Sequence, residues 1–453
     1  RQEVYRECLT DGISGRNRAG ASLAYNGTEN FAPGQRFGFF LSASVGWNIA
    51  EEPWMENLTG DILNQFKVRF SYGQSGNDNI GGNRFAYQQE YLSGGNIRLG
   101  YNTRNYWGPL YNEGKAANEN VTWEVSTKRN LGFDFRLFRG LTGTVDLYNE
   151  SRENILMDSW TPMWTLQKDA TANLGETKTH GMEIELGWRD ELGNDFSYNI
   201  NGYVSFNENR IVKRNDGYAT PEHLKDAGKP INYTSTRIVN GYYESLDDIY
   251  NYAVPSERTN QSYMIPGDFM FIDYNADGVI DGNDAVVHEK VTYPLNTYAL
   301  DLGLRYKGWA FSVKFYGVSD INTHLDPLIL WDNWNGQRGQ YKAWPNITQR
   351  WTPENSGNAA KPALHSEHTG YSRSTSSYTY RSASYVRLKN VELSYQFRQD
   401  LLRKIGLKRL QVYANGNNLL TWSSLPDKID PEARGAGIHP LVKRMNLGFR
   451  ASF

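Results

Sequence analysis

The clearest chemical pattern in the sequence is a short acidic segment, 273–284, which reads DYNADGVIDGND. Its oxygen-bearing residues recur at the spacing of an EF-hand-type loop, and Gly278 stands where such a loop turns sharply. The donor positions are Asp273, Asn275, Asp277, Val279 through its carbonyl, Asp281 and Asp284, which replaces the usual bidentate Glu. Because Ca²⁺ prefers such oxygen ligands, we predict one structural calcium site. The alternative is a solvated acidic turn.

Aromatic side chains concentrate in two long segments that lack a strand pattern, 213–296 and 323–383. The candidate contact residues are Trp331, Trp334, Trp344, Trp351, Tyr242 and Tyr243. Flat rings beside Asn, Asp and Arg can stack on sugar rings, but Tyr, Trp and Arg are also enriched at protein interfaces. Three interpretations therefore stay open: contact with a partner protein, contact with a substrate, and packing within the loops alone.

Other patterns give little support to an enzyme. No G-x-S-x-G motif occurs, and the segment 108–115 has one residue too many for a phosphate-binding loop. His365 and His368 lie three residues apart on a predicted loop, without a helix to direct both at one metal. The single cysteine, Cys8, excludes an internal disulfide and a cysteine-based zinc site. A net charge of −2 offers no general field for nucleic acid. We expect neither catalysis nor nucleic-acid binding.

The elements that must position these loops show a strict alternation of apolar and polar residues. Segment 121–138, VTWEVSTKRNLGFDFRLF, keeps this period of two for about 17 residues, whereas soluble strands usually run about 3–10 residues. At ~3.3 Å per residue such a strand spans roughly 56 Å, enough to cross a bilayer at a tilt and project beyond it. The phase predicts lipid-facing Trp123, Leu131, Phe133 and Phe135, and lumen-facing Glu124, Lys128, Asp134 and Arg136.

The same alternation predicts twelve strands, at 17–26, 36–50, 65–76, 121–138, 141–157, 178–190, 196–212, 297–307, 309–322, 384–397, 409–423 and 442–453. Their connections alternate between short turns and long loops, and the longest loops are 77–120, 213–296 and 323–383. Short periplasmic turns and long extracellular loops are typical of bacterial outer-membrane barrels. A soluble β-sandwich or propeller is the alternative, but the strand length and the lack of a blade-length repeat disfavour it. We predict an all-β, antiparallel transmembrane barrel in the outer membrane.

Several segments resemble the SusC/RagA-type TonB-dependent transporters of the Bacteroidota outer membrane. They are RFGFFLSASVGWNIAEEPWM (36–55), FKVRFSYGQSGND (66–78), TWEVSTKRNLGFDFRLFRGLTGTVDLYN (122–149), LGETKTHGMEIELGW (174–188), PGDFMFIDYNADGVIDGNDAVV (266–287), SASYVRLKNVELSYQF (382–397) and VYANGNNLLTW (412–422). The resemblance implies a barrel of about 22 strands with an N-terminal plug, and residues 1–453 are its C-terminal half. The terminal Phe453 resembles the family's signal for barrel assembly.

The resemblance also implies partners and a function. A SusD-like lipoprotein is expected as an extracellular lid, and a TonB complex is expected to act through the N-terminal part. The predicted function is active import of a nutrient, a glycan or peptide fragment, across the outer membrane. Two alternatives stay open: a barrel scaffold subunit of a larger outer-membrane assembly, and a surface hydrolase carried on a barrel.

Overall fold

The computed structural model describes residues 3–13, 17–55, 62–79, 81, 84–99, 106–138, 140–159, 169–193, 195–256, 264–288, 290–325, 348–365, 371, 374–403, 406–426, 429–433 and 438–452. For residues 3–13, 98, 99, 106 and 107 only the backbone is described. The chain divides into two compact units: unit 1 is Arg1–Asp190, Asn201–Thr220 and Asp226–Ile231, and unit 2 is Glu191–Ile200, Pro221–Lys225 and Asn232–Phe453.

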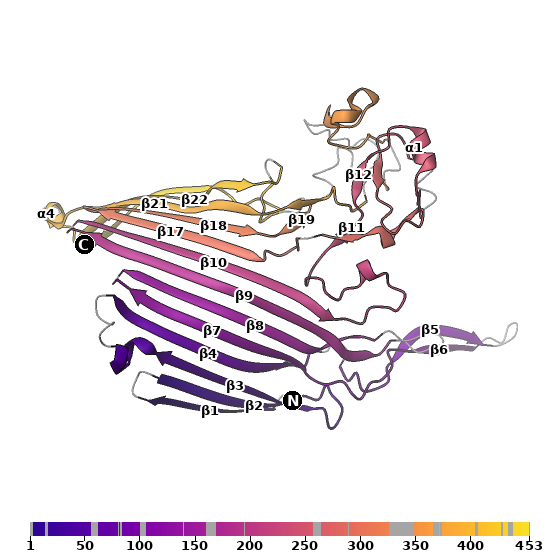
Figure 1. Cartoon of the computed structure of the whole chain (residues 1–453), viewed down its shortest axis with the longest axis horizontal. Coiled ribbons are helices and arrows are strands. Elements are labelled where there is room, and N and C mark those ends of the chain that lie inside the picture. Colours follow the sequence, from indigo (N-terminus) through magenta and orange to yellow (C-terminus); the bar gives the residue numbers. More distant parts are fainter. Residues whose placement is uncertain are drawn as a thin grey trace. The chain divides into compact units, whose positions relative to one another are not determined.

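Long antiparallel strands dominate both units, and within each unit neighbouring strands follow one another in the order of the chain (Figure 1). In unit 1 they are β1 (Glu3–Ile13), β2 (Asn17–Gly27), β3 (Phe37–Asn48), β4 (Leu63–Asn77), β7 (Glu124–Leu137), β8 (Leu141–Asp158), β9 (Thr171–Leu192) and β10 (Phe196–Lys213). Strand β9 contributes its last two residues, and β10 its first residues, to unit 2. The remaining strands of unit 2 are β17 (Asn296–Tyr306), β18 (Trp309–Ser319), β21 (Tyr385–Gln396), β22 (Arg409–Ser423) and β23 (Arg444–Ser452).

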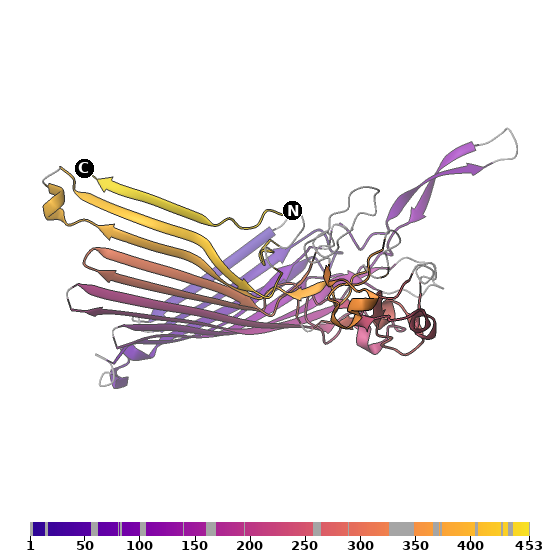
Figure 2. The ribbon, with the colours of Figure 1, turned by 90° about the horizontal axis from the view of Figure 1, so that it is seen from above.

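The connections between the long strands carry smaller elements. In unit 1 these are η1 (Ile49–Glu51), η2 (Pro53–Met55) and the hairpin of β5 (Tyr91–Leu99) and β6 (Tyr106–Glu113), which extends away from β4 and β7 (Figure 2). In unit 2 they are η4 (Glu222–Leu224), β11 (Ser235–Thr236), β12 (Val239–Tyr242), α1 (Leu246–Asn251), β13 (Val254–Pro255), β14 (Phe269–Phe271), β15 (Val279–Ile280), η5 (Gly282–Asp284), β16 (Val286–Val287), β19 (Asn322–His324), η7 (Pro353–Asn358), β20 (Tyr380–Ser382) and α4 (Gln399–Leu402). In the described part of the chain, no helix is long and apolar enough to cross a membrane.

All twelve predicted strands are present, most with ends within three residues of the prediction. The largest shift is at β9, which begins seven residues earlier than predicted. The prediction omits β1, whose charged residues interrupt the apolar alternation, and the β5–β6 hairpin inside the predicted loop 77–120. It also omits the short strands and helices inside the predicted loops 213–296 and 323–383. The tightest turn joins β17 to β18, where Lys307 and Gly308 both have positive φ, as a two-residue type I′ hairpin requires.

Each unit has its own apolar core. In unit 1 the buried cluster is small and consists of Phe31, Phe40, Val121 and Trp123. In unit 2 the core lies among the long loops and the adjoining strand ends, and it consists of Tyr243, Ile249, Met264, Phe269, Phe271, Ile280, Val318, Ile321, Leu325, Tyr371, Ala383, Tyr385 and Leu425. The loops of unit 2 therefore pack together around one core rather than extending separately.

Candidate functional sites on the sheet faces and in the long loops

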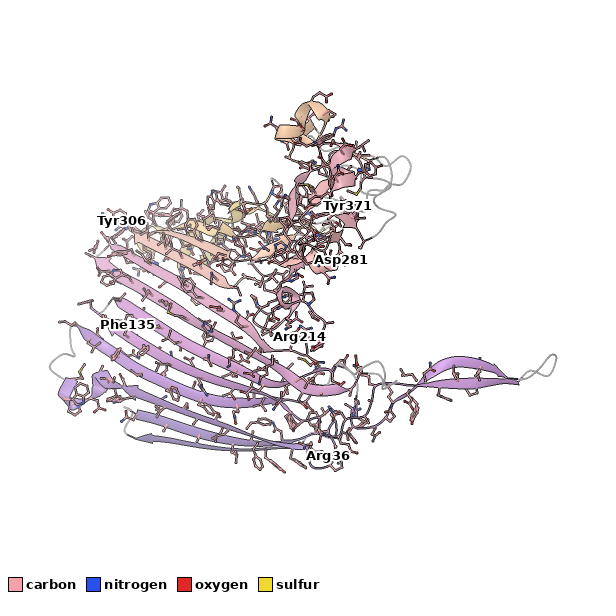
Figure 3. All side chains as sticks on the ribbon, turned by 45° about the vertical axis from the view of Figure 1, so that its right-hand side comes forward. Arg36, Phe135, Arg214, Asp281, Tyr306 and Tyr371 are labelled. Carbon is pink, nitrogen blue, oxygen red and sulfur yellow. The ribbon has the colours of Figure 1, made fainter. Side chains whose placement is uncertain are left out.

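The strand register in unit 1 separates a polar face from an apolar face. Residues that pair across β2, β3, β4, β7 and β8 share a face, because side chains alternate along every strand. One polar row is Gly20, Ser44, Ser71, Asn130 and Tyr148; the next is Arg18, Gly46, Arg69, Gly132 and Asp146. The intervening apolar row is Ala19, Val45, Phe70, Leu131 and Leu147. Side chains project from both faces of the strands (Figure 3).

Arg69 organises the ion pairs of the polar face. Its guanidinium donates to both carboxylate oxygens of Asp134, at 2.7 and 2.9 Å, and to Asp146 at 3.1 Å. Such a forked, charge-assisted arrangement fixes geometry as well as contributing energy. A second group pairs Arg152 with Glu124 and Glu150 at 3.2 and 3.1 Å. These pairs lie on the face predicted for the lumen, as the sequence phase requires for Glu124 and Asp134.

Two open cavities lie on the polar face of unit 1. The first has a volume of about 610 Å³, and its polar side chains come from Arg18, Ser44, Lys67, Arg69, Ser71 and Asn130. The second has a volume of about 510 Å³, and its polar-face side chains come from Ser22, Ser42, Ser44, Ser71, Ser75 and Lys128. Gly20, Ser44 and Ser71 line both cavities. The polar face therefore offers hydroxyl groups and cations to an aqueous space.

The apolar face of unit 1 exposes large side chains. Phe70 is 47% exposed, and Leu131, which lies beside it in the register, shares its face with Phe133 and Phe135. The predicted phase is correct for these residues, but it is wrong for Trp123. That residue precedes β7, is only 4% exposed and packs edge-on against Phe31 and Phe40, while its indole N–H donates to the Arg36 carbonyl. The alternation ends where the chain leaves the sheet, and Trp123 turns into the small core.

The acidic loop 273–284 is closed by its own carboxylates. Asp273 accepts backbone N–H groups from Asp277 and Gly278, at 3.2 and 2.8 Å. The buried Asp284 accepts from Tyr274 at 2.8 Å and from Asp281 at 2.8 Å. The other predicted donors lie on the same loop: Asn275 donates from its side chain to Asp277, and Asp281 caps η5. Val279 begins β15.

Calcium binding by these donors stays a prediction. Among the described residues, no group of three or more His, Cys, Asp and Glu side chains is arranged to hold a metal ion. In this structure, backbone N–H groups donate to the carboxylates of Asp273 and Asp284. Each carboxylate oxygen can accept more than one partner, so the donor set itself remains compatible with a hard cation.

The predicted aromatic contact residues have different environments. Tyr243 is 1% exposed and lies beside Tyr371 in the core of unit 2, and burial raises the pKa of both hydroxyls. Trp351 is also buried. Tyr242 is half-buried, stacks on Phe269, and has a pKa raised to about 12 by burial and by the neighbouring Tyr378. For these three, packing within the loops is the interpretation that matches their surroundings. Trp331, Trp334 and Trp344 lie outside the described residues.

His365, which the sequence disfavours as a metal ligand, pairs with a buried carboxylate. His365 lies 2.6 Å from Asp268, whose other oxygen accepts the Ile265 backbone N–H at 2.9 Å. The two residues are far apart in the chain, so no local spacing could have linked them. The pair ties segment 348–365 to the strand β14 region, where Ala363 also donates its backbone N–H to the Gly267 carbonyl.

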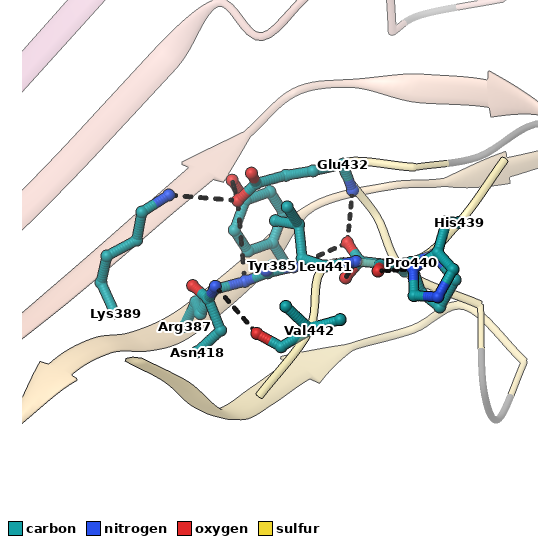
Figure 4. A network of polar contacts seen from close by, with 10 residues as sticks. Tyr385, Arg387, Lys389, Asn418, Glu432, His439, Pro440, Leu441 and Val442 are labelled. Atoms are coloured by element: carbon teal, nitrogen blue, oxygen red, sulfur yellow. Dashed lines mark hydrogen bonds and ion pairs between the residues drawn. The ribbon is translucent and has the colours of Figure 1, made fainter. Parts of the chain in front are cut away.

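A second polar network fixes the loop that follows β22 (Figure 4). Arg387 on β21 is 1% exposed, and its guanidinium donates to Asp430 at 2.7 Å. Asp430 also accepts the backbone N–H groups of Glu432 and Leu441, at 2.9 and 3.2 Å. The Tyr385 hydroxyl donates to Glu432 at 2.6 Å. Through Asp430, the buried Arg387 guanidinium therefore fixes the backbone of this loop at both Glu432 and Leu441.

Comparison with known proteins adds an independent line of evidence. A family model described as "TonB dependent receptor-like, beta-barrel" matches residues 12–321, more than half of the chain. The chain belongs to this family. TonB-dependent receptor P3 of Formosa agariphila is 26% identical over 434 residues, which are 93% of this chain and 41% of that protein. TonB-dependent receptor SusC of Bacteroides thetaiotaomicron is 25% identical over 444 residues, 95% of this chain and 42% of that protein. The chain thus spans about two-fifths of the length of these curated relatives.

Solved structures show the same fold. The RagAB peptide transporter matches with a TM-score of 0.73 and 19% identity, over all of this chain and 48% of that one. The RagAB peptide importer in its "open-open" state matches with a TM-score of 0.75 and 18% identity, over all of this chain and 47% of that one. The predicted fold and the resemblance to SusC/RagA-type receptors are confirmed.

Membership of this family assigns an environment to the two sheet faces. The family is one of outer-membrane β-barrels, and the chain is an all-β, antiparallel part of such a barrel. In a barrel with a polar interior, outward residues alternate with inward residues along each strand. The apolar face with Phe70 and Leu131 is therefore the lipid face, and the polar face with Arg69 and Asp134 is the luminal face.

Proposed function

We propose that this chain is the C-terminal barrel portion of a TonB-dependent importer that takes a glycan or peptide fragment across the outer membrane. The proposal rests mainly on one observation, that the same strands have an apolar face and a polar face. One face exposes Phe70 and other apolar side chains, and the other carries ion pairs and open cavities lined by hydroxyls and cations. A wall of this kind separates lipid from a water-filled conduit. One family relative is named as receptor SusC, and the RagAB structures are titled as a peptide transporter.

The partners belong to the same proposal. A SusD-like lipoprotein would cover the extracellular loops, and the TonB complex would act through the part of the receptor outside residues 1–453. Trp331, Trp334 and Trp344 stay proposed contacts for the lid or the substrate. The chain would contribute a conduit and no catalytic group.

Uptake by the full-length receptor tests the proposal. Cells that carry the complete gene and its neighbours should accumulate a labelled oligosaccharide or peptide, and deletion of the gene or collapse of the proton gradient should abolish accumulation. Unchanged uptake of all tested nutrients after deletion, with loss of a surface complex, would favour the scaffold alternative. Release of cleaved product outside the cell without accumulation would favour the hydrolase.

The topology has its own test. In a Cys8→Ser background, Tyr218→Cys places a thiol on a fully exposed site in the loop 213–296, and Lys307→Cys places one in the two-residue turn between β17 and β18. A membrane-impermeant thiol reagent on whole cells should label Tyr218→Cys and spare Lys307→Cys. The reverse pattern would invert the assignment of long loops to the outside.

We also propose that the loop 273–284 binds one structural Ca²⁺. Its support is the donor order and the capacity of Asp273 and Asp284 to accept further partners. Asp273→Asn with Asp277→Asn keeps hydrogen-bond acceptors but removes two charges. Millimolar Ca²⁺ should slow amide exchange in segment 269–287 of the wild-type receptor and leave this double variant unchanged. Exchange that ignores Ca²⁺ in the wild type would show that backbone hydrogen bonds alone close the loop.

A further inference from the structure

The lipid face of unit 1 ends along a single row of the strand register. On β7 this face is apolar from Leu137 to Leu131, and the next residue on it is Arg129. The neighbouring strands change from apolar to polar or amphipathic residues at the same row. The residues that pair across the row are Tyr72 on β4, Arg129 on β7, Asn149 on β8 and His180 on β9. The row therefore marks one edge of the surface that contacts lipid.

This row lies at the height of the outer-leaflet headgroups. At ~3.3 Å per residue and a strand tilt of ~40°, Arg129 is about 20 Å above Leu137, which adjoins the short turn to β8. The apolar band of such barrels is about 25 Å tall, and an Arg side chain near its edge can extend its guanidinium farther out. Beyond the row the strands continue toward the long loops, which we propose to be extracellular. Tyr72 suits this height, because amphipathic rings are enriched where hydrocarbon meets headgroups.

Arg129 is exposed, and no acid lies beside it in the register. Its direct partners on the two neighbouring strands are Tyr72 and Asn149. Its diagonal neighbours on those strands are Phe70, Gln74, Leu147 and Ser151. Within the described residues, the Arg129 side chain forms no ion pair and no hydrogen bond. On this face of β8 the acid is Glu153, which lies two rows farther out and accepts the Ser151 hydroxyl.

Cations at the outer ends of β9 and β10 are different, because they have counter-ions. Glu208 lies 2.9 Å from the Arg210 guanidinium and 3.5 Å from the His180 ring. Glu176 lies 3.5 Å from the Lys178 ammonium. A charged side chain on the lipid face costs free energy that falls toward zero only where water or headgroups can solvate it. The Arg129 guanidinium is therefore the cation at this height whose charge is left for a group outside the chain to neutralise.

We propose that Arg129 and its polar neighbours bind the headgroup of a phosphorylated glycolipid in the outer leaflet. The planar guanidinium matches phosphate oxygens and would bind the phosphate. Asn149 is exposed, and its side-chain amide, which makes no hydrogen bond within the described residues, would bind sugar hydroxyl or amide groups. Thr127 and Ser151 offer hydroxyls in the next row out. The site lies outside the conduit, on the face opposite to Asp134, so the inference goes beyond import.

Lipid binding by the full-length receptor tests the inference. The receptor is purified in a mild detergent and titrated with monophosphoryl lipid A, with dephosphorylated lipid A or with phosphatidylglycerol, and native mass spectrometry counts the bound copies. We expect the first copy of monophosphoryl lipid A to bind more tightly than either other lipid. Arg129→Gln should weaken that binding by roughly three- to tenfold, because an exposed ionic contact contributes modestly.

Two matched variants locate the site. Lys178→Gln removes a cation that Glu176 already neutralises, so the affinity should change by less than about twofold. Asn149→Arg adds a second guanidinium to the same row and should strengthen binding of monophosphoryl lipid A, a gain that a misfolded receptor could not show. Equal effects of Arg129→Gln and Lys178→Gln, or an affinity that does not depend on the lipid phosphate, would overturn the site. Equally tight, equally Arg129-dependent binding of phosphatidylglycerol would overturn the assignment to a glycolipid.

Discussion

Aromatic side chains have opposite surroundings in the strands of unit 1 and in the loops of unit 2. On the apolar face of β3 and β4, Phe39 and Phe70 are exposed, whereas Phe269 and Phe271 in the loops are fully buried. An exposed apolar face of this extent requires a non-aqueous neighbour, and a buried cluster requires none. The apolar face of these strands therefore suits contact with lipid, and the loops of unit 2 form a water-exposed body with its own apolar core. Aromatic residues therefore occur both on a lipid-facing surface and in a buried core, and only the tertiary structure distinguishes the two environments.

The largest effect is expected from a cavity introduced into the apolar core of the unit 2 loops. Phe271 packs edge-on against Tyr371, with ring centroids 5.1 Å apart, and Arg237 lies over its ring. Phe271→Ala should cost about 3–5 kcal/mol of local stability. Hydrogen exchange in the full-length receptor should rise across 239–287 but not across β7 and β8. Tyr274→Ala, at a half-exposed ring in the same loop, is the control that should change little. Equal effects of both would argue against a cooperative loop core.

The next effect concerns the buried cation at the base of the loop 424–443. Arg387→Met leaves Asp430 without its guanidinium and should cost about 3 kcal/mol, because an unpaired charge stays behind. Protease sensitivity of 424–443 should increase. Arg398→Met is the matched control: its ion pair with Asp400 is exposed, so the change should be within about 0.5 kcal/mol. Resistance of the Arg387 variant to cleavage would show that the loop is held by other contacts.

A third change tests the two faces of one strand. Phe70→Arg puts a charge on the lipid face of β4, which costs about 2–4 kcal/mol near the bilayer midplane. Ser71→Arg puts the same residue on the luminal face, next to an open cavity. Yield of folded barrel and heat-modifiability on gels should fall for Phe70→Arg only. Asp134→Arg is a weaker control, because Arg69 binds that carboxylate. Equal damage at positions 70 and 71 would contradict the assignment of the faces.

The sequence predicted the strands far better than the loops, and the reason is physical. Period-two alternation is a local signal, and it located β7 and the lipid-facing phase of Phe133 without any tertiary information. The burial of Tyr243 depends partly on residues far away in the chain, such as Phe269 and Tyr371, so composition could mark it as aromatic but not as buried.

The candidate sites show the same division between local and distant signals. The donors of loop 273–284 were recognisable because they are local. The cations Arg18 and Lys67, and the pair His365–Asp268, come together only through pairing of distant segments. A sequence pattern can therefore propose a short loop as a site, but it cannot assemble a cavity from several strands.

The smallest predicted effect is a pH dependence confined to the loop body of unit 2. His288 lies 2.6 Å from the Thr236 hydroxyl and stacks on Tyr380, whose ring also contacts His324. Burial lowers the pKa of His288 below its ordinary value of 6.5. The unfolded segment then binds more protons than the folded one below this value, so stability should fall as the pH drops through about 6.5 and should be constant above it. Amide exchange around β11 and β16 should be faster at about pH 5.5 than at about pH 7.5, after correction for the intrinsic rate. His288→Gln should remove this difference. Slower corrected exchange at the lower pH would instead mean that the folded state favours the charged imidazole. This part of the unit 2 loops would then be more hydrated than its packing indicates.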